Sequence, residues 1–158
     1  FIEESKTDDK WELARQYKLI DFVKWLTKQT GSKHTGVYFE GAGEGIQGNI
    51  YQIKGVRPFI FDVVVDDHFV SKKQMVEYVE TFFGNRDLLA PILAEGVLFK
   101  DWLNNKTYAD AADGKSMLFD TLREGYVVSL WDCVKTNPKL GRIILKFRSK
   151  EYLAKHDT

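Results

Sequence analysis

The sequence predicts an α+β domain with largely antiparallel sheets and flanking helices. Strand-like runs rich in Val, Ile and Phe follow one another across glycine and proline turns, which is typical of hairpins. Helix-like segments occur between these runs without the regular strand–helix alternation of a parallel sheet. The chain has 158 residues, of which 44% are hydrophobic. That size can bury one substantial core, so we expect a single domain over residues 1–158.

Charge, cysteine content and hydropathy limit the kinds of site and the location expected for this protein. Lys and Arg number 23 and Asp and Glu number 23, so the formal net charge is zero and any site for a polyanion must be local. Cys133 is the single cysteine and has no partner in the chain for a disulfide. The three histidines are scattered, which disfavours a zinc site. No apolar run approaches the roughly 20 residues of a membrane span, and no signal peptide is evident in these residues, so an intracellular protein is expected.

The first elements predicted are helices. Thr7, Asp8 and Asp9 are cap-like residues before Trp11, and apolar residues then recur at helical spacing. We expect one or two helices that end near Gly31, with their aromatic face in the core.

The stretch from Gly36 to Val65 contains strand-like runs around a glycine-rich turn. The first strand ends near Glu40, a second is expected over residues 49–53, and residues 55–58 separate that pair from a third over residues 59–65. Glycines beside a strand form a hairpin turn or a ligand cradle, and the spacing alone leaves both open. By residue type alone, Glu40 fits an exposed side chain beside a turn slightly better than a group that binds a ribose hydroxyl or a metal.

The strand over residues 59–65 contains one carboxylate within an apolar run. Strict alternation predicts Phe59, Phe61 and Val63 on one face and Ile60 and Asp62 on the other. An aromatic side chain in such a strand packs in a core or stacks on a base. Asp62 needs a partner if it is buried.

The remaining elements follow from caps and turns. Ser71 begins a helix that ends at Gly84, and a further helix is expected over residues 102–112. The sequence DGKS at residues 113–116 is not a P-loop, because Ala109 stands where the first glycine of that motif is required. Strands are expected over residues 125–131 and 142–147, with a turn at residues 137–141 between them.

Two charged motifs lie in this last part of the chain. In REGYVV at residues 123–128, Glu124 is either a magnesium ligand or half of a surface Arg–Glu pair. In RIILKFRSK at residues 142–150, Lys146 and Arg148 are two residues apart and therefore share a strand face. Paired cations on one face suit a phosphate, although isolated surface charges are usually just solvated.

The order and spacing of these motifs resemble motifs III, IIIa, IV and V of the covalent nucleotidyltransferases, specifically ATP-dependent RNA ligases of the RNA ligase 2 type. FEG at residues 39–41, followed by GIQGN, resembles motif III, and the FD of FIFDV resembles motif IIIa. REGYVV is similar to motif IV, and LKFRS is similar to motif V. The segment WELARQYKL at residues 11–19 resembles the helix that these ligases place before motif III.

The resemblance implies a role for each matched residue. Phe61 would stack on the adenine, and Glu40 would bind near the ribose. Glu124 would be a catalytic residue that places a divalent metal, Mg²⁺ or Mn²⁺. Lys146, also catalytic, and Arg148 would hold the α-phosphate of ATP. In the family a lysine attacks ATP to form lysyl-AMP, AMP passes to an RNA 5′-phosphate, and a 3′-hydroxyl then displaces AMP to join the RNA ends.

Two departures from the family pattern qualify this expectation. Arg148 stands where motif V usually has a second lysine. No K-x-D-G sequence, the motif that supplies the lysine nucleophile, occurs in the chain. In the family this motif lies well before motif III, and the chain begins with Phe1 rather than methionine. We therefore expect an N-terminal remainder of the same protein to carry the nucleophile, and expect this segment alone to be inactive.

Two alternatives stay open. A noncatalytic nucleotide- or RNA-binding module would keep the pocket and lack the nucleophile. A second candidate for motif IV is AEGVLF at residues 94–99, which contains Glu95. REGYVV is preferred because its distance to Lys146 fits the family better.

Overall fold

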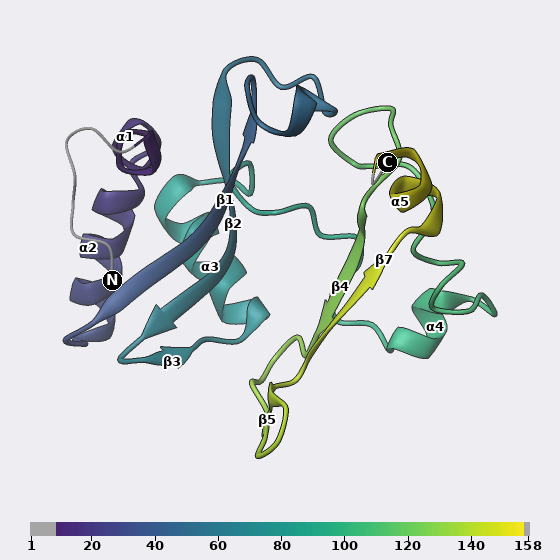
Figure 1. Cartoon of the computed structure of the whole chain (residues 1–158). Coiled ribbons are helices and arrows are strands. Elements are labelled where there is room, and N and C mark those ends of the chain that lie inside the picture. The colour runs from purple at the N-terminus through teal and green to yellow at the C-terminus, as the bar shows by residue number, and fades with distance from the viewer. Residues whose placement is uncertain (1–8, 157–158) are drawn as a thin grey trace. The chain divides into compact units, whose positions relative to one another are not determined.

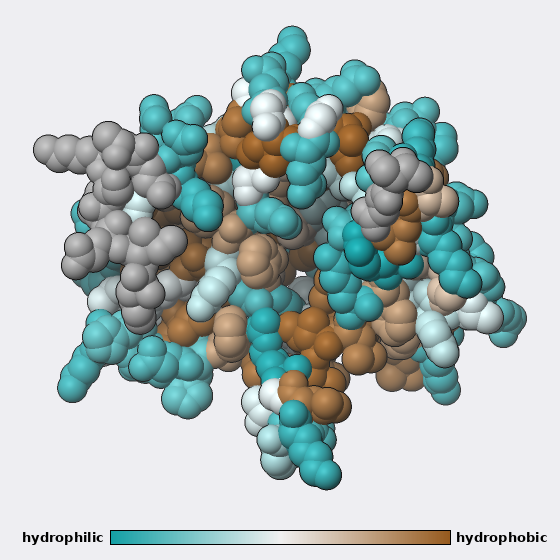
Figure 2. Space-filling model, viewed as in Figure 1, coloured by the Kyte–Doolittle hydropathy of each residue, from teal (hydrophilic) through white to brown (hydrophobic). Residues whose placement is uncertain are grey.

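The computed structural model describes residues 9–156, which form two compact units that divide between Ala90 and Pro91 (Figure 1). Within the described residues, no helix is long and apolar enough to cross a membrane. Hydrophilic residues cover much of the face seen in Figure 2, and apolar residues reach the surface in several places between them.

The first unit begins with helices α1 (Asp9–Gln16) and α2 (Leu19–Thr30). Lys18 separates them with a left-handed backbone, φ 57°, and Gly31 ends α2 in the same conformation, φ 64°. The predicted helices and their end are therefore confirmed. Thr7 and Asp8, the predicted cap residues, lie outside the described residues.

A three-stranded antiparallel sheet follows, with the order β1 (Thr35–Gly43), β2 (Val56–Val65) and β3 (His68–Phe69). The connection between β1 and β2 contains a short 3-10 helix, η1 (Gln47–Asn49), so the strand expected over residues 49–53 is wrong. Left-handed residues in this loop prevent an extended strand, and Asn49 closes the loop by bonding both the amide and the carbonyl of Ile53. The separator expected at residues 55–58 is also wrong, because β2 already begins at Val56.

Gly43 explains part of the glycine content of this loop. Its φ is 139°, and a Cβ atom there would lie 2.0 Å from the carbonyl oxygen of Gly55. Only glycine permits this approach of the two chain segments. The pairing of Gly43 with Val56 at the end of the ladder depends on it.

Helix α3 (Lys72–Phe83) has the predicted caps. The Ser71 hydroxyl accepts a hydrogen bond from the Gln74 amide at 3.1 Å, and Gly84 ends the helix at φ 77°. Helices α2 and α3 pack on each other, α2 packs on β1, and α3 packs on β2. Phe22 of α2 is fully buried and its ring lies 5.4 Å from that of Phe82, so the aromatic face is core as expected.

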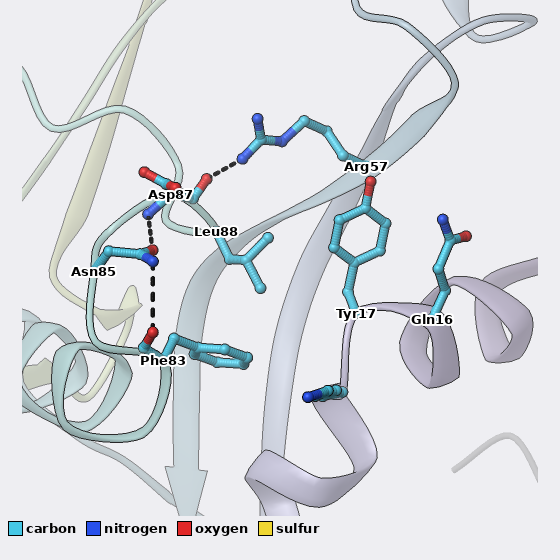
Figure 3. Close-up of a pocket in the computed structure, with 8 residues that line it drawn as sticks. Gln16, Tyr17, Arg57, Phe83, Asn85, Asp87 and Leu88 are labelled. Carbon is cyan, nitrogen blue, oxygen red and sulfur yellow. Dashed lines mark hydrogen bonds between the residues drawn. The ribbon is translucent and has the colours of Figure 1, made fainter.

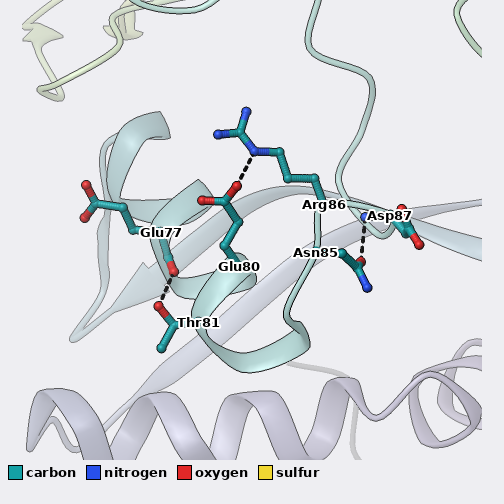
Figure 4. A network of polar contacts seen from close by, with 6 residues as sticks. All are labelled: Glu77, Glu80, Thr81, Asn85, Arg86 and Asp87. Atoms are coloured by element: carbon teal, nitrogen blue, oxygen red, sulfur yellow. Dashed lines mark hydrogen bonds and ion pairs between the residues drawn. The ribbon is translucent and has the colours of Figure 1, made fainter.

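Polar contacts fix the segment that follows α3 (Figure 4). Arg86 Nε donates to Glu80 Oε1 at 2.5 Å, and Asn85 Oδ1 accepts a hydrogen bond from the Asp87 amide at 2.9 Å. The chain then runs beside β2, where the Ile60 amide donates to the carbonyl of residue 88 at 2.7 Å. The edge of β2 at the middle of the strand is thereby occupied.

In the second unit, residues 91–156 form two two-stranded antiparallel sheets and two helices. Its elements are α4 (Phe99–Leu103), β4 (Gly125–Ser129), β5 (Thr136–Asn137), β6 (Gly141–Arg142), β7 (Ile144–Arg148) and α5 (Lys150–His156). Strand β4 pairs with β7, and β5 pairs with β6 across the predicted turn. These pairings confirm the antiparallel arrangement expected from the sequence.

The helix expected over residues 102–112 is wrong. Helix α4 ends at Leu103 because Asn104 and Asn105 adopt left-handed conformations, with φ of 47° and 65°. The alanines at its expected end instead pack in the core of the unit, where Ala112 is fully buried beside Tyr126. The apolar composition of this segment correctly indicated residues of the core, whereas the left-handed asparagines end the helix.

Candidate functional site

Glu124, Lys146 and Arg148 meet on the sheet of β4 and β7. Glu124 directly precedes β4, Lys146 lies opposite Val127, and Arg148 lies opposite Gly125. Lys146 Nζ lies 2.9 Å from Glu124 Oε1, and Arg148 Nε lies 3.7 Å from the same oxygen. The predicted shared face of the two cations therefore also holds the predicted carboxylate.

This cluster is open to solvent. The side chains of Glu124, Lys146 and Arg148 are 38%, 58% and 46% exposed. Exposed ion pairs contribute between 0 and about 1 kcal/mol to stability, so the cluster adds little to folding. The N–H donors of Lys146 and Arg148 outnumber the lone pairs of the one Glu124 carboxylate. Val127 lies opposite Lys146 and adds an exposed apolar side chain on the same face. An ammonium, a guanidinium and a carboxylate at one place are suited to a phosphate with its metal.

Arg123 fixes the start of β4. Its guanidinium donates hydrogen bonds to the backbone carbonyls of Ala111, Ala112 and Asp113 at 2.6–3.2 Å. The alternative of a surface Arg–Glu pair in REGYVV therefore does not hold, because Arg123 binds carbonyls and Glu124 pairs with Lys146.

Ser149 connects the two strands of the site. Its amide donates to the Glu124 carbonyl at 2.8 Å, and its fully buried hydroxyl donates to Asp113 Oδ1 at 2.6 Å. This second bond is the main cause that lowers the pKa of Asp113 below its usual 3.8. The hydroxyl oxygen also accepts the Tyr152 amide and so caps α5. The backbone of Glu124 is thus held by Ser149 and lies beside Arg123, whose side chain is fixed by carbonyls of residues 111–113.

Gly125 allows the two strands to meet. Its φ is 152°, and a Cβ atom would lie 2.0 Å from the Phe147 carbonyl oxygen. A side chain at this position would push Glu124 away from β7. The glycine in the EG pair of REGYVV is therefore required by the local geometry.

Glu40 and Phe61 lie in the first unit, on β1 and β2. The register of these strands shifts at Phe61, since Tyr38 is opposite Asp62 and Phe39 is opposite Ile60. Phe61 is therefore the extra residue of a β-bulge. The strict alternation predicted from the sequence is wrong at this point, because Phe61 is 39% exposed whereas its neighbours on both sides are buried.

Asp62 has the partner that its burial requires. Its carboxylate is in a 2.6 Å ion pair with Lys72 Nζ, and that ammonium also donates to the Phe61 carbonyl. Asp62 is 3% exposed. The expectation that a buried Asp62 needs a partner is confirmed, and the same lysine holds the bulge that exposes Phe61.

Tyr38 belongs to the same surface, although the sequence reading did not single it out. Tyr38 and Glu40 are both exposed and are two residues apart in β1, so they share a face of the sheet. The Tyr38 ring lies 6.2 Å from the Phe61 ring. Glu40 and Phe61 therefore lie on one side of the sheet, and the two-residue period back from Glu40 would have identified Tyr38.

A separate cavity of about 370 Å³ lies in the first unit (Figure 3). Arg57 crosses it to the Asp87 carbonyl and lies over the Phe59 ring at 5.1 Å. Tyr17 closes another side through a 3.2 Å hydrogen bond to a β2 carbonyl. The lining contains none of the residues matched to motifs III to V, and these contacts tie β2 to its neighbours. The lining residues are Gln16, Tyr17, Lys18, Arg57, Phe83, Asn85, Asp87 and Leu88.

Two further features bear on catalysis. Within residues 9–156, no group of three or more His, Cys, Asp or Glu side chains is arranged to hold a metal. Glu124 fits a different kind of site, because Mg²⁺ commonly uses one or two carboxylates together with substrate phosphates.

Lys115 is not suited to be the lysine nucleophile. A nucleophilic lysine needs a lowered pKa, whereas the hydrogen bond to Asp120 raises the pKa of Lys115.

The second motif IV candidate has a different local structure. Glu95 lies in an exposed loop before α4, and Val97 and Leu98 are 56% and 62% exposed. Glu124 instead leads directly into a paired strand. The geometry favours REGYVV over AEGVLF.

No family model and no curated protein sequence matches the chain. Solved structures of Naegleria gruberi RNA ligase do. A mutant with ATP and Mn aligns with a TM-score of 0.73 at 26% identity, over 99% of this chain and 43% of that one. The same ligase with PPi aligns with a TM-score of 0.73 at 25% identity, and a mutant with AMP and Mn aligns with a TM-score of 0.72 at 25% identity. Both alignments cover 99% of this chain and 43% of the ligase. The chain thus spans less than half the length of these relatives, and it has an RNA ligase nucleotidyltransferase fold.

Proposed function

We propose that this chain is part of an ATP-dependent RNA ligase of the RNA ligase 2 type, which joins RNA 5′-phosphate and 3′-hydroxyl ends through lysyl-AMP and RNA-adenylate intermediates. The observation that carries the proposal is the cluster of Glu124, Lys146 and Arg148 on β4 and β7. The similarity of the chain's fold to structures of an RNA ligase solved with ATP, AMP and Mn also supports the proposal.

In this proposal Lys146 and Arg148 bind the α-phosphate of ATP. Their charges offset the negative charge that builds on the phosphate oxygens during transfer. Lys146 is the more mobile point charge, and the Arg148 guanidinium offers a planar fork of donors. A ligand phosphate would compete with Glu124 for both cations, since Lys146 Nζ and Arg148 Nε lie 2.9 and 3.7 Å from the same Glu124 oxygen.

Glu124 is proposed to hold Mg²⁺ or Mn²⁺. The bound metal would neutralise phosphate charge in the transfer steps. The carboxylate is suited to this because Arg123 and Ser149 fix its backbone while its side chain remains exposed. The ion pair with Lys146 orients the carboxylate until the nucleotide and metal arrive.

Phe61 is proposed to stack on adenine, with Glu40 near the ribose. The bulge in β2 exposes the Phe61 ring, which a strand core position would bury. Glu40 lies on the same face of the sheet, and a carboxylate accepts hydrogen bonds from ribose hydroxyls.

We further propose that both units belong to one nucleotidyltransferase domain, and that a part of the same protein outside these 158 residues supplies the lysine nucleophile. The absence of K-x-D-G from the sequence and the 43% coverage of the related ligase support this. The alternative is a noncatalytic nucleotide- or RNA-binding module that retains the phosphate and base contacts.

Labelling of the full-length protein with ATP that is radioactive in its α-phosphate tests the proposal. A metal-dependent protein–AMP adduct, followed by sealing of a 5′-labelled RNA into a phosphatase-resistant product, is expected. Retained ATP binding without an adduct supports the noncatalytic module. The 158-residue segment alone is expected to form no adduct, and an adduct on it would overturn the assignment of the nucleophile to another part of the protein.

A further inference from the structure

Three aromatic rings on neighbouring strands form a continuous surface on the first unit, which we name the aromatic strip: Tyr38 of β1, Phe61 of β2 and Phe69 of β3. The Tyr38 ring lies between the other two, 6.2 Å from Phe61 and 5.7 Å from Phe69. Tyr38 is 49% exposed and Phe61 is 39% exposed, whereas Phe69 is half-buried.

We propose that Tyr38 is a second stacking position for a nucleobase, beside the one on Phe61, and that it binds the terminal base of an RNA end. This inference rests on the proposed ligase function. It adds to that function a protein contact for RNA, which none of the matched motif residues supplies.

The geometry of Tyr38 supports this role. Neighbouring rings on both sides restrict its side chain, so little conformational entropy is lost when a ligand stacks on it. The Tyr38 and Phe61 rings are tilted by 51°, so ligands stacked on the two rings would lie in different planes. A face with exposed rings on adjacent strands is a common way for sheets to bind single-stranded RNA.

The strip is not explained by folding. The core of the first unit is made by buried residues of α1, α2, α3, β2 and residues 88–89, and it includes Phe22, Ile60 and Val63 at 0% exposure. Tyr38 has half its surface in solvent and lies outside that core. Its aromatic ring and hydroxyl suit a flat ligand with polar edges, such as a base.

The proposal commits to an RNA base because the strip is continuous with the Phe61 position proposed for adenine. An RNA-adenylate joins AMP to the 5′-terminal nucleotide, so a base of RNA is present close to the adenine during the reaction. The base on Tyr38 belongs either to the strand with the 5′-phosphate or to the strand with the 3′-hydroxyl, and substrates can distinguish these sources.

A cycle of protein and RNA substitutions tests the contact. The full-length protein and its Tyr38→Leu and Tyr38→Phe variants are compared for binding of pre-adenylylated RNA and for sealing in a single turnover. Each substrate carries a normal or an abasic terminal nucleotide, in one arm at the adenylylated 5′ end and in the other at the 3′-hydroxyl end. Pre-adenylylated RNA makes these measurements independent of lysyl-AMP formation.

We expect Tyr38→Leu to weaken binding of the normal substrate by about 5- to 150-fold, the range for loss of one stacked base. In the arm whose terminal base stacks on Tyr38, we expect the Tyr38→Leu variant and the wild type to bind the abasic substrate equally. The Tyr38→Phe variant should behave as the wild type in both arms. Tyr108→Leu, which removes a 59%-exposed tyrosine from the second unit, serves as the matched control and retains the wild-type dependence on the base.

Two results would overturn the inference. In the first, the losses of binding caused by Tyr38→Leu and by the abasic nucleotide are independent in both arms, so that the variant weakens binding of the abasic substrate as much as binding of the normal one. In the other, Tyr38→Leu lowers the melting temperature and weakens normal and abasic substrates alike, which identifies the strip as a packing surface. If the wild type forms an AMP adduct and seals RNA, either result removes only the role of Tyr38. Failure of the wild type to do so refutes the ligase proposal itself.

Discussion

Replacement of Lys72 by methionine is expected to destabilise the first unit by about 3 kcal/mol. Removal of one partner from a buried ion pair costs about 3–5 kcal/mol, because the other charge stays in a poorly hydrated place. The Asp62 side chain is 4% exposed and that of Lys72 is 20% exposed. The lower end of the range applies because the pair is not wholly sealed from water.

The same exposures predict an asymmetry. Asp62→Asn leaves the Lys72 ammonium able to reach water and to keep its bond to the Phe61 carbonyl, so a loss of about 1 kcal/mol is expected. Urea denaturation followed by tryptophan fluorescence measures both losses, with Lys73→Met as the control for removal of a neighbouring charge. A loss from Lys72→Met equal to or smaller than that from Asp62→Asn would refute the argument that burial of the carboxylate dominates.

Three other substitutions test the site. Glu124→Ala should abolish metal-dependent AMP transfer in the full-length protein and leave the melting temperature nearly unchanged, since its ion pair is exposed; retained activity would remove Glu124 from the site. Phe61→Leu should weaken ATP binding by about 5-fold or more, measured by titration, with little loss of stability because the ring is 39% exposed. Asp113→Asn should reduce acid sensitivity: the folded-state pKa of Asp113 is lowered from 3.8, chiefly by Ser149, so its contribution exists above about pH 4 and disappears as pH falls through the lowered pKa. Melting temperatures between pH 7 and 3 measure this, and an unchanged acid limb would contradict it.

The parts of the fold that follow from local chemistry were predictable. The Ser71 cap, the Gly84 end of α3 and the turn at residues 137–141 appear where the sequence places them. The strand expected at residues 49–53 and the long helix after residue 102 failed for one shared reason. Left-handed residues at Gln52 and Asn104 interrupt segments whose apolar content favours regular structure.

The candidate site was predictable to different degrees. Two-residue spacing correctly predicted that Lys146 and Arg148 share a face. Nothing in the spacing indicated that Ser149 would bind the Glu124 carbonyl or that Lys72 would neutralise Asp62. Such contacts join residues far apart in the chain, and local patterns carry no information about them.

The sequence by itself determined the fold class, the order of the motifs and the residue types that suit a phosphate and a base. Those features depend on periodicity, turn chemistry and charge, which are properties of short segments. Tertiary structure alone decided that β1 and β2 meet out of register at Phe61 and expose its ring beside Tyr38. A bulge arises from how two strands pair, so a strand read by itself predicts alternation where the paired strands expose neighbouring aromatic rings.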